Sequence, residues 1–151
     1  MHTPVPTALV KISDTNLTIA APAVDIRGRR VLDCAGEHIG SVVNLLLDEA
    51  EQKVRFLEVT SGGLLGLNAR SVLIPVDAIQ HIGAKYVSLS HALEHVERAP
   101  RYDPTLVQTS DYAAIYGHYG YSPFWGQGLS YPTYPASFLR PVGEAKTPRR
   151  S

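Results

Sequence analysis

The sequence predicts a mainly β fold in which a small β-barrel is followed by a short C-terminal helix and an extended aromatic tail. Short runs of β-forming residues, separated by turn residues, occupy the first hundred positions. Charged side chains are concentrated in that region, whereas aromatic side chains are concentrated after it. A chain of 151 residues has room for one hydrophobic core of ordinary size and an appended segment, which argues against two complete domains.

Five predicted strands form the barrel, and turn or helix signals separate them. They are expected at 30–33, 39–48, 53–61, 71–76 and 86–89. The third is rich in β-forming residues and stops at Gly62 and Gly63, because glycine reaches backbone angles that are closed to other residues. Pro75 donates no ladder hydrogen bond, so the fourth strand is expected to end there or to lie at a sheet edge. Alternation in the second strand predicts one shared face for Ile39, Ser41, Val43, Leu45 and Leu47.

A short helix is expected directly after the strands. Ser90 is a suitable N-cap for a helix over 91–99, and Pro100 helps to end it. Two further short strands are expected upstream, at 8–12 and 17–20. These elements divide the chain into an N-terminal arm, a barrel domain and a C-terminal extension, at 1–22, 23–100 and 101–151.

The C-terminal extension differs from the barrel in composition. Asp111 is the only charged residue between Thr105 and Leu139, and the segment is rich in tyrosine and proline. Ser110 is expected to cap a short helix that runs through Tyr116. Disordered linkers carry many charges and few aromatic residues, so this segment is expected to pack. Docking on its own barrel and docking on another subunit both remain open.

Two groups of side chains are the predicted protein-interaction residues. Leu64 and Leu65 lie in a glycine-rich loop, where exposed leucines would form an apolar patch. The other group consists of the aromatic residues Tyr112, Tyr116, Tyr119, Tyr121, Phe124 and Trp125. Since closed two-fold dimers are the commonest soluble oligomers, we expect a homo-oligomer in which the segment 112–125 crosses onto the neighbouring protomer.

One short motif resembles a zinc site. His91, Glu94 and His95 follow the pattern in which two histidines one helical turn apart bind zinc and the glutamate acts as a base. A zinc hydrolase also needs a third protein ligand and a cleft, whereas this motif lies on a short helix at the edge of the domain. We expect a solvent-facing helix with Leu93 and Val96 packed inward, and no catalytic residue, metal site or cofactor. Adventitious or structural metal binding by the two histidines is the alternative.

Charge and cysteine content narrow the partners and the compartment. The formal net charge is zero, which argues against DNA and RNA as partners. Three basic residues at 27, 29 and 30 are flanked by Asp25 and Asp33, which predicts an edge of salt bridges. The single cysteine, Cys34, excludes an internal disulfide and fits the cytoplasm. No apolar run reaches the roughly 20 residues of a spanning helix, and no signal peptide is expected.

The predicted barrel also resembles a known family. The matching segments are 25–33, 36–42, 47–48, 54–59, 62–66 and 73–79. Over roughly 23–100 the chain is similar to the PRC-barrel domain, found in the H subunit of photosynthetic reaction centres and in a ribosome maturation factor. The segments 101–104, 116–126 and 131–132 resemble a subgroup of bacterial PRC-barrel proteins. The resemblance implies a small PRC-type β-barrel that holds other proteins or subunits.

The predicted function is therefore a non-enzymatic protein-binding or assembly module that associates with itself through its aromatic tail. One alternative is a peripheral subunit of an electron-transfer or photosynthetic complex, although no membrane anchor like that of the H subunit is expected here. A second is an RNA-associated ribosome-assembly factor, although the arm 1–22 is too short for the extra barrel of that family. The third is a zinc hydrolase that uses His91, Glu94 and His95.

Overall fold

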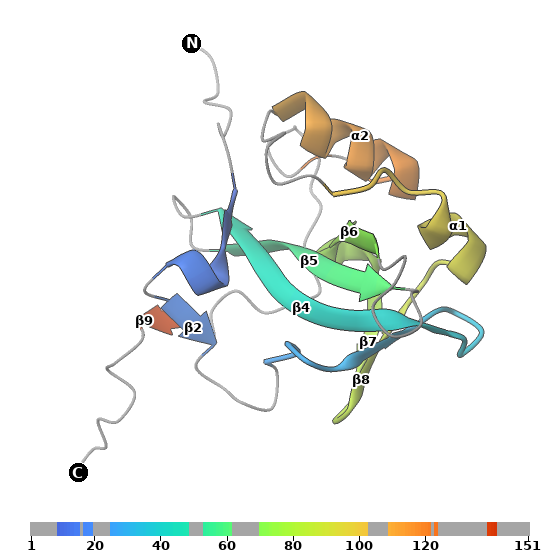
Figure 1. The fold of residues 1–151 in the computed structure, drawn as a ribbon, viewed down its shortest axis with the longest axis horizontal. Coiled ribbons are helices and arrows are strands. Elements are labelled where there is room, and N and C mark those ends of the chain that lie inside the picture. The colour runs from blue at the N-terminus through green and yellow to red at the C-terminus, as the bar shows by residue number, and fades with distance from the viewer. Residues whose placement is uncertain are drawn as a thin grey trace.

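A computed structural model describes residues 9–15, 17–19, 25–48, 53–61, 70–102, 109–121, 123 and 139–141 (Figure 1). Its strands are β1 (Val10–Lys11), β2 (Leu17–Ile19), β3 (Arg30–Leu32), β4 (His38–Asp48), β5 (Lys53–Ser61), β6 (Arg70–Pro75), β7 (Ile79–Ile82), β8 (Tyr86–Leu89) and β9 (Leu139–Pro141). Its helices are α1 (Leu93–Glu97) and α2 (Thr109–Tyr119), with 3-10 turns η1 (Ile12–Asp14) and η4 (Val76–Ala78).

Most of the strands form one bent sheet. Its order is β6-β5-β4-β3-β8-β7, and β1 pairs with β4 beside this path. Every neighbouring pair in it is antiparallel except β3 and β8, which run parallel. The turn η4 connects β6 to β7, the two ends of the sheet order. The predicted mainly β, barrel-like fold is confirmed.

The five predicted barrel strands agree with the structure to within one residue at each end, but β7 was not predicted, the strand expected at 8–12 gives way to η1 at Ile12, and one face assignment is wrong. Strands β5 and β8 have the predicted bounds, and β6 ends at Pro75 at one end of the sheet order. In β4 the pairing register shifts between Val42 and Asn44, which leaves Val43 48% exposed. The shared face predicted for residues 39, 41, 43, 45 and 47 is therefore broken by a β-bulge.

Helix α2 is longer than predicted. The expected end at Tyr116 is wrong, because the helix continues through Gly117 to Tyr119. It ends at Gly120, whose φ of +85° lies in the left-handed region. The Gly120 N–H donates to the Gly117 carbonyl at 3.1 Å, and the Tyr121 N–H donates to the Tyr116 carbonyl at 3.0 Å. These are the two hydrogen bonds of a Schellman C-cap.

One hydrophobic core joins the three predicted parts of the chain. Leu9 and Ile12 of the arm pack in the same buried cluster as the sheet and the α2 tyrosines. Strand β2 also pairs with β9, which brings Leu17 opposite Pro141. Among the residues that the structure describes, no helix combines the length and the hydropathy needed to cross a membrane.

Candidate functional site

Helix α2 covers the face of the sheet that carries Phe56. The Tyr112 and Tyr116 rings lie 5.7 and 4.9 Å from the Phe56 ring, centroid to centroid. Tyr112 is 3% exposed and Tyr116 is 1% exposed, and α2 lies above β5 and β6 in Figure 1. Buried aromatic rings of this kind contribute large apolar areas and favourable ring contacts. In this structure, the part of the predicted crossing segment within α2 packs on its own barrel.

Tyr112 also connects α2 to the N-terminal arm. The Leu9 N–H donates to the Tyr112 hydroxyl oxygen at 3.4 Å, between residues 103 positions apart. Burial raises the pKa of Tyr112, and its hydrogen bond from Leu9 opposes that rise. The arm, the sheet and the extension therefore meet at one ring.

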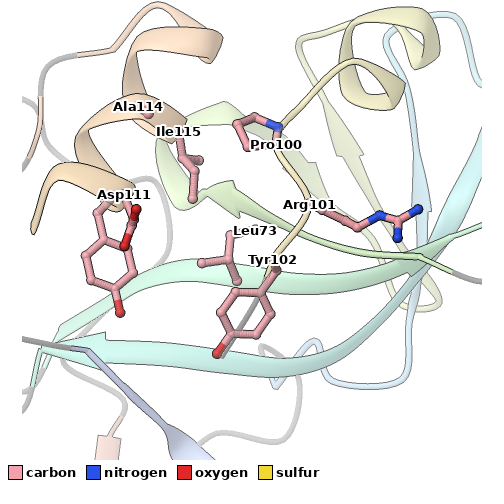
Figure 2. A pocket seen from close by; sticks show the side chains of 8 residues that line it. Leu73, Pro100, Arg101, Tyr102, Asp111, Ala114 and Ile115 are labelled. Atoms are coloured by element: carbon pink, nitrogen blue, oxygen red, sulfur yellow. The ribbon is translucent and has the colours of Figure 1, made fainter. Parts of the chain in front are cut away.

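A pocket of about 150 Å³ lies between α2, β6 and the segment that follows α1 (Figure 2). It is lined by Leu73, Pro100, Arg101, Tyr102, Asp111, Tyr112, Ala114 and Ile115. Its walls are mainly apolar, and the Arg101 guanidinium points away from the pocket in Figure 2. A cavity of roughly this volume accepts a benzene-sized group.

Backbone pairing holds the segment after α1, which forms one wall of the pocket, against β6. Arg101 forms an isolated antiparallel bridge with Val72, and the Tyr102 N–H donates to the Ser71 carbonyl at 2.9 Å. The Lys11 ammonium lies 5.7 Å from the centre of the Tyr102 ring. The residues after α1 thus pair with the edge of β6 through one isolated bridge.

The zinc-like motif has a different role from the one its pattern indicates. Helix α1 begins at Leu93, so His91 precedes the helix. The His91 Nε2 donates to the Tyr119 carbonyl at 3.0 Å, and the His95 Nε2 donates to the His118 carbonyl at 2.6 Å. One ring nitrogen of each histidine is therefore already engaged by a backbone carbonyl. Within the described ranges, no three His, Cys, Asp or Glu side chains are grouped so that they could hold a metal ion.

The predicted solvent-facing position of these histidines is also wrong. His91 and His95 are half-buried, because the end of α2 packs against them, whereas Glu94 is exposed. The inward packing of Val96, which is buried, and of Leu93, which is half-buried against the core, is confirmed.

Asp33 was predicted to lie in an edge of salt bridges, but its buried carboxylate accepts backbone hydrogen bonds instead. Its Oδ1 accepts the Ala35 and Glu37 N–H groups at 2.8 and 2.7 Å, and its Oδ2 accepts the Leu93 N–H at 2.8 Å. Burial alone would raise the pKa of this carboxyl, but the backbone N–H groups around it lower the pKa overall. Asp33 thus provides the hydrogen bond to the start of α1 that was expected from Ser90.

The other residues singled out in the sequence comprise one confirmed ion pair, Tyr121, and four residues outside the described ranges. Arg27 forms the expected salt bridge with Asp25, from Nη2 to Oδ2 at 2.6 Å. Burial raises the pKa of the Asp25 carboxyl. The hydrogen bonds and the charge of Arg27 lower it by a larger amount, so the pKa lies below its ordinary value. Tyr121 is half-buried, and its hydroxyl lies 3.3 Å from the Ser90 hydroxyl. The predicted interaction residues Leu64, Leu65, Phe124 and Trp125 lie outside the described residues.

Comparison with protein families assigns the segment that forms most of the sheet to a known domain. The sequence model of the PRC-barrel domain matches residues 20–90. The chain carries a PRC-barrel domain. Strands β3 to β8 lie within the matched range, as does Leu73 in the pocket. All the other pocket residues follow the PRC-barrel domain, so the pocket forms where the C-terminal extension packs on the barrel.

Proposed function

We propose that the protein is a non-enzymatic protein-binding and assembly module in which α2 completes a binding site on the PRC-barrel domain. The pocket carries this proposal. Its walls come from Leu73, Tyr102 and Ile115 among others, and its volume of about 150 Å³ suits one apolar side chain. Burying a side chain of that size contributes about 1.5–3 kcal/mol, which suits an anchor residue of a protein partner.

The partner we propose is a second copy of the chain, in the cytoplasm. The extension carries Phe124 and Trp125, and the Phe124 side chain has the benzene-sized ring that the pocket accepts. Reciprocal insertion in a two-fold dimer would bury two such rings. The single thiol, Cys34, which is exposed, is compatible with a reducing compartment.

Light scattering on the purified chain tests this proposal across micromolar concentrations. We expect a dimer, and Ala114→Leu is expected to weaken it because the added side chain fills the pocket. Gly117→Ala is the matched control, since it changes the same helix at a position with open space around it and should leave the dimer intact. Replacing Phe124 and Trp125 with serine should also weaken the dimer.

A monomeric wild type overturns self-association. Equal dimerisation of Ala114→Leu and wild type overturns the role of the pocket. Salt-dependent binding of RNA by the monomer would favour the ribosome-assembly alternative instead.

A further inference from the structure

Three histidines join the two helices. The His91, His95 and His118 rings form a row, which we term the histidine stack. The His91 and His95 ring centroids are 5.2 Å apart with an interplanar angle of 26°, and those of His95 and His118 are 4.2 Å apart with an angle of 23°. The Tyr119 ring meets all three edge to face, at 5.1, 5.5 and 5.0 Å.

The histidine stack satisfies the backbone at the end of α2. Carbonyls in the last turn of a helix have no partner within it. Here the His118 and Tyr119 carbonyls accept hydrogen bonds from His95 and His91. The His118 Nε2 donates in return to the His95 carbonyl at 2.7 Å. The end of α2 is therefore attached to α1 by imidazole groups on both helices.

Protonation changes the charge of these contacts without removing the donors. A first positive charge is favoured by the negative end of the α2 dipole. A second charge would lie on a neighbouring ring within about 4 to 5 Å, where like charges in a partly buried site repel strongly. Burial lowers the pKa of His91, as do the charges of His95 and His118, and these outweigh the opposing effect of the Tyr119 carbonyl.

The described surroundings supply little compensating negative charge. The turn before β4 carries Asp33, Cys34 and Glu37, and β4 begins at His38. Helix α1 and the residue after it carry Glu94, Glu97 and Arg98, α2 carries Asp111, Tyr112, Tyr116 and Tyr119, and Arg70 on β6 and Tyr121 complete the set. Asp33 directs both carboxylate oxygens to backbone N–H groups. Glu37, Glu94 and Glu97 are exposed to solvent. Burial raises the pKa of Tyr119, so this phenol stays neutral.

We propose that the histidine stack is an acid-sensitive latch, which holds the end of α2 on α1 when its imidazoles are neutral and releases it when more than one is protonated. Release would separate the Tyr116 end of α2 from Phe56 and open the pocket, while the sheet stays folded. This inference is independent of the proposed binding function, because it concerns only the contact between the two helices.

Amide hydrogen exchange of the full chain, followed by NMR from pH 7.5 to pH 5 and corrected for intrinsic rates, tests the latch. The N–H groups of Gly120 and Tyr121 report the end of α2, and those of Leu57 and Val59 report the sheet. We expect protection at the α2 end to fall at least tenfold on acidification, with unchanged protection in the sheet.

Two variants separate the latch from general acid sensitivity. Replacing all three stack histidines with glutamine keeps a side-chain N–H donor but removes the charge, so protection should become independent of pH. His81→Gln changes an exposed histidine on β7 and should behave as the wild type. If the triple variant does not dock at pH 7.5, His91→Gln alone provides the comparison and should shift the loss of protection to lower pH.

Constant protection at the α2 end of the wild type overturns the latch. Simultaneous loss of protection in the sheet also overturns it, because release would then be part of global unfolding. An acid response of the triple stack variant, or of His91→Gln where that variant is used, equal to that of the wild type also overturns the latch, because the effect would then come from other groups.

Discussion

Replacing Asp33 should destabilise the fold in two distinguishable steps. The buried carboxylate accepts three backbone N–H groups, two in its own turn and one at Leu93, sixty residues away. Asp33→Asn keeps one oxygen for the turn but places an N–H₂ group against the Leu93 N–H. Asp33→Ala removes all three hydrogen bonds. The two variants therefore separate the link between turn and α1 from the turn itself.

Hydrogen bonds to charged groups contribute about 1.5–3 kcal/mol each, so Asp33→Asn should cost about 2 kcal/mol. Asp33→Ala should cost about 4 kcal/mol, since the three bonds share one carboxylate and are not fully additive. For a chain of this size, 1 kcal/mol corresponds to roughly 2–4 °C in Tm. We therefore expect Tm to fall by roughly 4–8 °C and 8–16 °C in the two variants.

The pH dependence has a defined sign. The pKa of Asp33 in the folded protein lies below its ordinary value of 3.8. Its contribution to stability is therefore present above that value and is lost as pH falls through the folded pKa. The stability difference between wild type and Asp33→Ala should be largest near neutral pH and should shrink in strong acid.

Urea unfolding at several pH values, followed by circular dichroism, provides the measurement. Glu37→Ala is the control, because that exposed side chain lies in the same turn and its replacement should cost less than about 0.5 kcal/mol. The reasoning is refuted if Asp33→Asn is as stable as the wild type at pH 7. It is also refuted if the wild type and Asp33→Ala differ equally at all pH values.

Three further predictions concern α2. The Tyr119 hydroxyl is buried without a hydrogen-bond partner, so Tyr119→Phe should leave the free energy of unfolding unchanged or raise it by up to about 1 kcal/mol. A decrease of more than about 1 kcal/mol in urea unfolding would contradict this. Phe56→Ala should cost about 3–5 kcal/mol because it removes the ring under Tyr112 and Tyr116, and a cost below about 1 kcal/mol would show that α2 does not depend on this contact. Gly120→Ala should lower Tm because the φ of +85° disfavours a side chain, whereas Gly117→Ala should raise it by improving helix propensity; equal shifts would contradict the observed helix end.

The sequence alone determined the features that depend on neighbouring residues. Strand β5 is marked by its β-forming residues and the glycines that follow it, and β8 by the turn before it. The Arg27–Asp25 ion pair joins residues two positions apart. The segments 25–33 to 73–79 were also sufficient to identify the PRC-barrel resemblance, because a family pattern is itself carried by the sequence.

Features that depend on distant residues were decided only by the tertiary structure. Local propensity cannot show that β3 pairs in parallel with β8, or that the Asp33 carboxylate meets the Leu93 N–H. It also placed the end of α2 at Tyr116, before Gly117, whereas packing of Tyr116 and Tyr119 offsets the cost of a glycine within the helix. The histidines of the zinc-like motif became helix-capping donors because α2 supplies carbonyls 23 and 28 residues further along the chain. Such contacts depend on which surfaces the folded core brings together, and no pattern within a short segment contains that information.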